Sequence, residues 1–380
     1  MNNEITRREL MATGAATLVA SALPAVANAA EAKEFAFPLL GDLHFDRLEH
    51  HDMAWLRKEK PNDIRQVENY SRITREVLPG LFAEVKQQIA AQKVAVPFAV
   101  HIGDFVEGLA GTPELALRHC REAVAFVEAA KIGAPFLFCK GNHDVTGPGS
   151  VEACNAVLMP FLAKQAKQDL DGSALTVRQG DSLFVYFDAY DDPARKGLDR
   201  LEKQLAARGN AKQVFFIIHP PVVPYGARST WHIFAKPAEA AARTRLLNLL
   251  GEHRAIVFCG HLHKYGTVVR QTEKGSFVQM AVISVLSSPE AKPKDLVSSV
   301  KEYGPDLVRL EPNFSPTTID ERRDYLKVEA PFIRHYDYAD APGYSIVRVN
   351  NKSEVSVDMY TGLGKRFWKT IKLTELLRKA

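Results

Sequence analysis

The chain has 380 residues, of which 46% are hydrophobic and 25% are charged. This composition is typical of a globular protein with a substantial core, and it excludes intrinsic disorder, a collagen-like fibre and a small disulfide scaffold. Because 49 Lys and Arg nearly balance 45 Asp and Glu, the net charge is only +4, and no stable complex with nucleic acid through bulk charge is expected.

The N-terminal 29 residues are typical of an export signal. Arg7 and Arg8 precede an uncharged, alanine-rich stretch that ends in Ala27-Asn28-Ala29, which is an A-x-A-like cleavage site. The paired arginines resemble a twin-arginine signal, whose export machinery carries folded proteins. We therefore expect a periplasmic or secreted mature chain of residues 30–380. A membrane anchor is the weaker alternative, because the stretch is only weakly hydrophobic and no later segment is apolar enough to span a membrane.

Short apolar runs alternate with segments of helical periodicity over the first two thirds of the chain. Strands are predicted at 35–40, 97–102, 135–139, 183–188, 214–218 and 255–259. Helices are predicted at 66–92 with a break at Pro79, and at 114–130, 151–168, 197–207 and 238–250. This alternation predicts an α/β layered fold.

After residue 263 the pattern changes to strands with little helix between them. These strands are predicted at 266–270, 276–284, 345–349, 354–359 and 367–373. The segment 287–342 is rich in proline and charged residues, and we expect a long irregular insertion there. The mature chain is thus predicted to be a single domain, with the terminal strands 343–373 returning to its core.

The chain has four cysteines, Cys120, Cys139, Cys154 and Cys259. An even number in an oxidising compartment permits one or two disulfides. Cys139 and Cys259, however, end apolar strand-like runs, which favours a role as small buried side chains.

Side chains that commonly bind metals follow five of the predicted strands. They are Asp42 and His44, then Asp104, then Asn142, His143 and Asp144, then His219, and finally His261 and His263. Because the carboxyl ends of strands in an α/β sheet converge on one crevice, we expect these clusters to meet there. Carboxylate, carboxamide and imidazole groups without thiolates suit Mn, Fe, Zn or Ni.

In this order the motifs resemble those of the calcineurin-like metallophosphoesterases, over residues from about 36 to 270. The resemblance implies a four-layered αββα sandwich and a centre of two divalent or mixed-valence metal ions. Carried over residue by residue, it puts Asp42, His44 and His263 on one metal, Asn142, His219 and His261 on the other, and Asp104 between them. His143 matches the family's histidine near the scissile phosphate, and Asp144 matches the partner that orients it.

Two metals lower the pKa of a bridging water, so that hydroxide is present near neutral pH to attack phosphorus. The resemblance therefore implies an exported phosphoesterase for small phosphate esters, with phosphodiesters favoured. One alternative is a phosphomonoesterase or nucleotidase of the same fold, and another is a metal-binding or scaffold protein without turnover. Glu107 stands where purple acid phosphatases have a metal-bound tyrosine, which disfavours a purple iron centre.

The segment 220–234 directly follows His219 and is expected to overhang the site. Arg228, Trp231 and His232 within it are candidates for binding a phosphate or stacking on a base. His50 and His51 are expected to lie in a solvated loop, and the alternative is that they line the mouth of the pocket.

Overall fold

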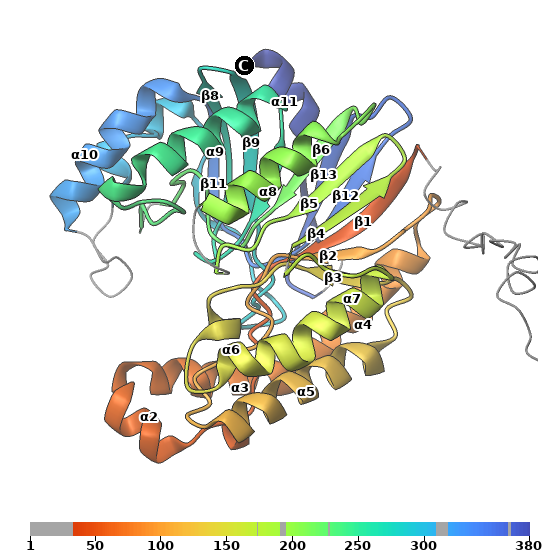
Figure 1. Ribbon diagram of the computed structural model, residues 1–380, viewed down its shortest axis with the longest axis vertical. Helices are drawn as coiled ribbons and strands as arrows, with labels where there is room; N and C mark the ends of the chain where they lie inside the picture. Colours follow the sequence, from red (N-terminus) through yellow and green to blue (C-terminus); the bar gives the residue numbers. More distant parts are fainter. Residues whose placement is uncertain (1–32, 173, 191–194, 227–228, 309–317, 364–365) are drawn as a thin grey trace, which may run out of the picture.

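The computed structural model describes residues 33–172, 174–190, 195–226, 229–308, 318–363 and 366–380. The proposed signal and Arg228 lie outside these residues. The described residues form two β-sheets with helices on their outer faces (Figure 1). This is the expected α/β class, with its layers in the order helix, sheet, sheet, helix.

The first sheet contains strands from both ends of the chain. Its order is β14 (Arg366–Lys372), β13 (Val355–Thr361), β12 (Gly343–Val349), β1 (Phe35–Leu40), β2 (Ala99–His101) and β3 (Phe136–Phe138). β1, β2 and β3 are parallel, whereas β12 pairs with β1 in the antiparallel sense. The carboxyl ends of β1, β2 and β3 therefore lie at the same edge of the sheet.

The second sheet has strands of both directions around a parallel centre. Its order is β10 (Lys294–Val297), β11 (Ile333–Asp340), β8 (Tyr265–Thr272), β9 (Gly275–Ala281), β7 (Ile256–Cys259), β6 (Gln213–Ile217), β5 (Ser182–Tyr186) and β4 (Leu175–Gln179). β5, β6, β7 and β9 are parallel. β5, β6 and β7 are fully buried, as the continuous apolar runs in the sequence predict.

Two groups of helices complete the layers (Figure 1). The first sheet is flanked by α2 (Met53–Glu59), α3 (Ile64–Glu76), α4 (Leu78–Ala90), α5 (Pro113–Ala130), α6 (Ser150–Ala153) and α7 (Met159–Ala166). The second sheet carries α8 (Arg195–Ala206) and α9 (Ala240–Glu252), with α10 (Ile319–Glu329) at one end and α11 (Leu373–Lys379) against β9 and β13. Among the described residues, no helix is long and apolar enough to cross a bilayer.

Aromatic side chains join the two sheets. Phe37 of β1 makes edge-to-face contacts with Phe184 and Phe215 of the second sheet, at centroid distances of 5.4 and 5.8 Å. Phe215 in turn stacks on Phe184 at 4.5 Å. Such pairs stabilise by about 0.5–1.5 kcal/mol beyond the burial of their area. The core between the sheets thus fixes their relative position, and with it the position of the strand ends.

The structure corrects three expectations. The segment 287–342 is not irregular throughout, because β11 pairs with β8 along its length and α10 packs beside it. His50 and His51 are buried, with exposed fractions of 0% and 7%, instead of lying in a solvated loop. All four cysteines are buried and free, so none of the permitted disulfides is formed.

A buried carboxylate holds α10 in place. Glu329 Oε1 lies 2.8 Å from Arg243 Nη2 of α9, and Glu329 Oε2 lies 2.8 Å from Arg270 Nε of β8. Burial alone would raise the pKa of Glu329, but the two guanidinium groups outweigh it and lower the pKa to about 2. The ion pairs therefore stabilise the fold at neutral pH, and this contribution is lost as the pH falls from about 4.5 towards 2.

We expect Glu329→Gln to lower the free energy of unfolding by about 3–5 kcal/mol at pH 7, because it leaves two buried guanidinium groups without a counter-charge. The difference from the wild type should shrink between pH 5 and pH 3. Denaturant unfolding of both proteins at pH 7, pH 5 and pH 3 measures these differences in the free energy of unfolding. Glu128→Gln, which removes an exposed partner of Lys164, is the control and should cost less than about 1 kcal/mol. Equal unfolding curves for wild type and Glu329→Gln at pH 7 would contradict the expectation.

Candidate metal centre

The predicted clusters converge where the carboxyl ends of β1, β2, β3, β6 and β7 meet. All seven predicted metal ligands lie together there: Asp42, His44, Asp104, Asn142, His219, His261 and His263. Five of them have positive φ angles, namely Asp42 (30°), His44 (45°), Asp104 (53°), His261 (73°) and His263 (51°). Non-glycine residues rarely adopt this conformation, and such strain is concentrated at functional sites.

Glycines allow the strand ends to approach one another. A Cβ atom on Gly141 would lie 2.1 Å from the backbone nitrogen of Asp104. A Cβ atom on Gly260 would lie 2.7 Å from Asp42 Oδ2. Any side chain at either position would push two ligand-bearing loops apart, which explains the glycine before the motif residue in these clusters.

One group of four side chains is suited to a first metal. Ligand atoms of Asp42, His44, Asp104 and His263 all lie within 4.8 Å of one another. His44 Nε2 is 3.0 Å from His263 Nε2 and 3.6 Å from Asp104 Oδ2, and His263 Nε2 is 3.6 Å from Asp42 Oδ1. The four atoms surround a point that a single cation can occupy.

A second group shares Asp104 with the first. Ligand atoms of Asp104, His219 and His261 lie within 4.8 Å of one another, and His219 Nε2 is 3.1 Å from Asp104 Oδ2. Asn142 belongs here as well, because its Oδ1 lies 2.8 Å from His261 Nδ1 and 3.1 Å from His219 Nε2. Asp104 is the one residue common to the two groups, as expected for a carboxylate that bridges two metals.

The other ring nitrogens of three histidines have partners that fix their orientation. His44 Nδ1 lies 2.7 Å from Glu107 Oε2, and His219 Nδ1 lies 2.8 Å from the carbonyl oxygen of Ile102. His263 Nδ1 lies 3.2 Å from the hydroxyl of Tyr70. Each contact orients its ring with Nε2 directed into the centre, and such partners on the other ring nitrogen are typical of metal-binding histidines.

The electrostatics of these residues fit cations. Asp42 is fully buried, its Oδ2 has no hydrogen-bond partner among the described residues, and burial raises its pKa to about 7. Burial also lowers the pKa of His44 to about 3, which keeps its ring neutral with a free lone pair. A buried carboxylate with an oxygen that has no hydrogen-bond partner among the described residues, next to several imidazoles, is a poor hydrogen-bonding network but a good ligand set. The residues therefore fit two divalent metal ions.

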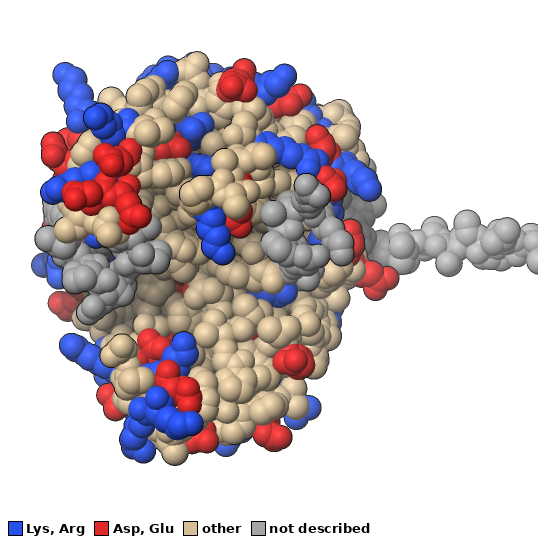
Figure 2. All heavy atoms as spheres, turned by 60° about the vertical axis from the view of Figure 1, so that its left-hand side comes forward, with Lys and Arg blue, Asp and Glu red and all other residues tan. Residues whose placement is uncertain are grey.

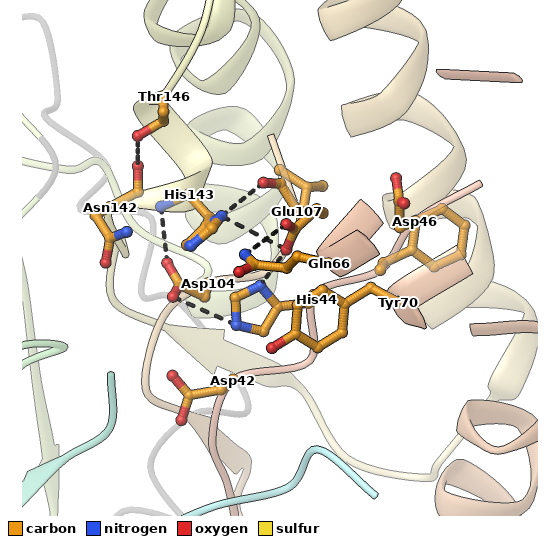
Figure 3. A network of polar contacts seen from close by, with 12 residues as sticks. Asp42, His44, Asp46, Gln66, Tyr70, Asp104, Glu107, Asn142, His143 and Thr146 are labelled. Atoms are coloured by element: carbon orange, nitrogen blue, oxygen red, sulfur yellow. Dashed lines mark hydrogen bonds and ion pairs between the residues drawn. The ribbon is translucent and has the colours of Figure 1, made fainter. Parts of the chain in front are cut away.

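His143 lies beside the centre, but its partner is Glu107 and not Asp144. His143 Nδ1 lies 2.7 Å from the carbonyl oxygen of Glu107 and 3.5 Å from its Oε2, and the backbone nitrogen of His143 donates to Asp104 Oδ1 (Figure 3). Asp144 instead accepts hydrogen bonds from the backbone nitrogens of Phe105, Val106 and Gly141. The expected Asp144–His143 pair is therefore wrong, because Asp144 is occupied in joining two loops.

Glu107 connects His143 to the first metal group. Its Oε2 faces His44 Nδ1, and its Oε1 accepts a hydrogen bond from Gln66 Nε2 at 2.8 Å (Figure 3). Burial opposes protonation of His143, but the carboxylates of Glu107 and Asp104 outweigh it and raise the pKa of His143 to about 9. His143 is thus an imidazolium at neutral pH in the absence of cations.

Helix α3 supplies two residues that sequence reasoning missed. Gln66 and Tyr70 are four positions apart, so they share one face of the helix and both reach the centre. The Tyr70 ring also stacks on His44, with a centroid distance of 4.2 Å and an angle of 8°. The spacing in the sequence indicates that Gln66 and Tyr70 share one helix face. It does not show that this face of α3 meets the metal ligands.

We expect Tyr70→Phe to weaken metal affinity by about tenfold, because His263 loses the partner that fixes its ring while the stacking on His44 remains. Competition with a metal chelator measures this. Tyr303→Phe removes a comparable buried hydroxyl, which donates to the carbonyl of Pro224, and should leave metal affinity unchanged. Equal affinities for all three proteins would show that Tyr70 does not position His263.

A cavity of 1210 Å³ opens above the centre. Asp104, His143, His261 and His263 line it, together with Arg65 and other residues of α3. On the face of the molecule drawn in Figure 2, charged side chains of both signs are interspersed. The cavity is large enough for a small organic phosphate and keeps the candidate ligands accessible from solvent.

The three candidate substrate contacts have different outcomes. The Trp231 ring lies against His261, with a centroid distance of 4.1 Å, so Trp231 borders the centre. His232 is buried at 4% exposure, stacks on Tyr325 of α10 and faces the carbonyl of Thr230, so the prediction that it binds substrate is wrong. Arg228 lies outside the described residues.

A sandwich of two sheets with two ligand groups that share one carboxylate defines a two-metal centre of the hydrolytic type. A family model for calcineurin-like phosphoesterases matches residues 37–265. The chain belongs to this family of metal-dependent phosphoester hydrolases, whose members typically bind two divalent metals.

Two solved structures are similar in fold. Purple acid phosphatase PPD1 from yellow lupin (Lupinus luteus) seeds superposes with a TM-score of 0.53 and 11% identity, over 92% of this chain and 56% of the lupin chain. A dimetal phosphatase from Danio rerio gives a TM-score of 0.51 and 13% identity, over 89% of this chain and 99% of the other. These identities show likeness of fold alone. A search of curated proteins gave no match.

Proposed function

We propose that the protein is an exported phosphoesterase that hydrolyses small phosphate esters, with phosphodiesters favoured over monoesters. The observation that carries the proposal is the position of Asp104, which is shared by the two ligand groups and also lines the cavity. A phosphoryl group in the cavity would therefore lie next to both metals.

The residues have separate tasks in this reaction. Two divalent cations, when bound, supply Lewis-acid activation of water and stabilise charge on the phosphoryl oxygens. Asp104 would hold both cations, because it belongs to both ligand groups, and Glu107 fixes the rings of His44 and His143. His143 has Nδ1 directed at Glu107, so its Nε2 proton is the one available for the leaving oxygen.

The proposal of a diester substrate is supported by the room between the walls of the cavity. Residues of α3, among them Arg65 and Asn69, form one wall. Lys264, which precedes β8, forms another together with Tyr338 and Asp340 of β11. In Figure 1 these elements belong to different layers of the sandwich. A phosphorus atom at the metals would thus have room for an organic group on either side.

The test compares kcat/KM for a bis-aryl phosphodiester and the matching aryl monoester. Protein freed of metal is loaded in turn with Mn, Zn, Fe or Ni, and Asp104→Asn is the control. Preference for the diester, lost in the control, supports the proposal. Preference for the monoester would contradict the proposed diester preference and would support a phosphatase or nucleotidase. Turnover of neither substrate despite bound metal would point to a metal-binding protein without activity.

One observation favours the nucleotidase alternative. Trp231 presents an aromatic ring against His261 at the edge of the centre. A nucleobase stacked on such a ring gains about 1–3 kcal/mol. If a nucleoside monophosphate is hydrolysed with a higher kcat/KM than either aryl ester, and Trp231→Ala removes that advantage, the nucleotidase is the better description.

We also propose that residues 1–29 are a twin-arginine signal and that the twin-arginine machinery exports the folded protein. The order of paired arginines, weakly apolar stretch and small residues supports this. Cell fractionation tests it by measuring phosphoesterase activity in the periplasm. The variant with Arg7→Lys and Arg8→Lys should stay in the cytoplasm, and equal periplasmic amounts of variant and wild type would contradict the proposal.

A further inference from the structure

We propose that the protein has a third metal site, separate from the dinuclear centre, in which Asp46, His50 and His119 bind one divalent transition-metal ion. The site lies between the loop after β1 and helix α5. Glu122 of α5 forms its outer edge. Nitrogen and oxygen ligands of this kind suit Zn²⁺ and related ions.

The three side chains are already close enough for a shared ion. One ligand atom of each lies within 4.8 Å of those of the other two. The rings of His50 and His119 face each other, with their centroids 4.5 Å apart, and His50 Nε2 is 3.1 Å from Glu122 Oε2. Ligands of a tetrahedral zinc ion with bonds of about 2.0–2.1 Å are about 3.3 Å apart. Binding an ion would therefore draw the three ligand atoms closer together than they lie without it.

Two buried nitrogens in the cluster point to a missing ligand. His50 and His119 have exposed fractions of 0% and 1%, and the Nδ1 atoms of both have no hydrogen-bond partner among the described residues. A buried polar atom without a partner destabilises the folded state. A bound cation would remove this cost by accepting the lone pairs.

The protonation of the two rings is suited to binding. Burial lowers the pKa of His119 to about 4 and lowers that of His50, so both rings are neutral at pH 7. His119 Nε2 lies 2.6 Å from the carbonyl oxygen of Phe45 and donates its proton there. This leaves Nδ1 of His119 unprotonated, and a carbonyl on the opposite ring nitrogen is typical of metal-binding histidines.

The charges around the cluster are compatible with a cation. His51 lies on the far side of Asp46, with Nε2 2.7 Å from Asp46 Oδ1 and Nδ1 3.0 Å from the carbonyl oxygen of Leu109. Asp46 also accepts a hydrogen bond from Ser71 Oγ through Oδ2, at 2.7 Å. Glu122 adds a second carboxylate, shared with Arg118, and its side chain is 29% exposed, which provides a route for the ion from solvent.

The site is separate from the dinuclear centre but connected to it. In Figure 3, Asp46 lies beyond Tyr70, away from Asp42 and Asp104. Its backbone nitrogen and carboxylate bond Thr74 and Ser71 of α3, the helix that also carries Tyr70. A bound ion would thus join the loop, α3 and α5 just beyond His44 and would act on stability, not on the chemical step.

The experiment counts metal in the whole protein. Metal-free protein is saturated with Zn²⁺, passed through gel filtration and analysed by elemental mass spectrometry. We expect about three equivalents in the wild type, and one fewer in both His50→Gln and His119→Gln, with phosphoesterase activity retained. His335→Gln, on β11, is the matched control and should bind as much as the wild type.

The test depends on the difference in zinc content between variant and wild type, so incomplete occupancy of the dinuclear centre does not affect it. Equal zinc content in the wild type and both variants would overturn the third site. If a variant fails to fold, anomalous diffraction at the zinc edge on the wild type decides. A peak between Asp46, His50 and His119 supports the site, and peaks confined to the dinuclear centre refute it.

Discussion

Asp104→Asn is expected to lower kcat/KM by at least about 10³-fold, which corresponds to about 4 kcal/mol of transition-state stabilisation. Asp104 belongs to both ligand groups, with Oδ2 at 3.1 Å from His219 Nε2 and 3.6 Å from His44 Nε2. Asparagine keeps the shape but removes the negative charge and offers one oxygen in place of two. It cannot bridge two cations, so both metal positions are affected at once.

Metal content and kinetics together check this expectation. Asp104→Asn should hold less metal than the wild type, and added metal should raise its melting temperature less, because an ion stabilises only the state that binds it. Asp63→Asn is the control, since Asp63 lines the same cavity but belongs to neither ligand group. A variant with full metal content and kcat/KM within tenfold of the wild type would remove Asp104 from its bridging role.

The elements of the fold that were predictable are those whose pattern is local. β1 occupies the predicted range, because Phe35–Leu40 is an apolar run that is buried on both faces. The break expected at Pro79 falls between α3, which ends at Glu76, and α4, which begins at Leu78. Proline is accommodated in the first turn of a helix, so a new helix can begin there.

The segment 287–342 was not predictable in this way, because its order comes from contacts with the rest of the chain. β11 mixes buried and partly exposed positions and is ordered by its pairing with β8. α10 is held by Glu329, whose partners Arg243 and Arg270 are 86 and 59 residues away. In the sequence these charges are typical of a solvated surface, and nothing local indicates that they are buried and paired.

The candidate site also has residues that a local sequence pattern predicts and residues whose roles depend on distant contacts. The seven ligands follow strands at a spacing that indicates metal binding, and the structure brings them together. Glu107 and Tyr70 act through His44, His143 and His263, which come from other loops, so no local pattern identifies their roles. The pairing of Asp144 with His143 was wrong for the same reason: adjacency in sequence does not show which acceptor a side chain meets.

His143→Ala is expected to retain metal and lose about 10²–10⁴-fold in kcat, the usual contribution of a general acid. His143 belongs to neither of the groups that share Asp104, and its Nδ1 is bonded to Glu107. Metal analysis and kcat on the same preparation check both parts. A parallel loss of metal and turnover would show that His143 supports the centre and does not act on the substrate.

The pH dependence gives a second readout. An acid must be protonated, so kcat/KM should fall as the pH rises through the pKa of His143, which is about 9 without cations and lower when they are bound. Glu107→Gln removes a carboxylate that raises this pKa and should move the alkaline limb to lower pH. In His143→Ala the limb should disappear, and an unchanged limb there would assign it to another group.

The leaving group separates proton donation from charge stabilisation. An aryl oxide with a low pKa departs without a proton, whereas an alkyl oxide needs one in the transition state. If His143 donates from Nε2, His143→Ala should lose much more activity on an alkyl phosphodiester than on an aryl one. If the imidazolium stabilises charge on the phosphoryl oxygens, the two losses should be equal, because both esters develop that charge. Glu107→Gln should show the same selectivity in weaker form, since Glu107 acts on the reaction through His143.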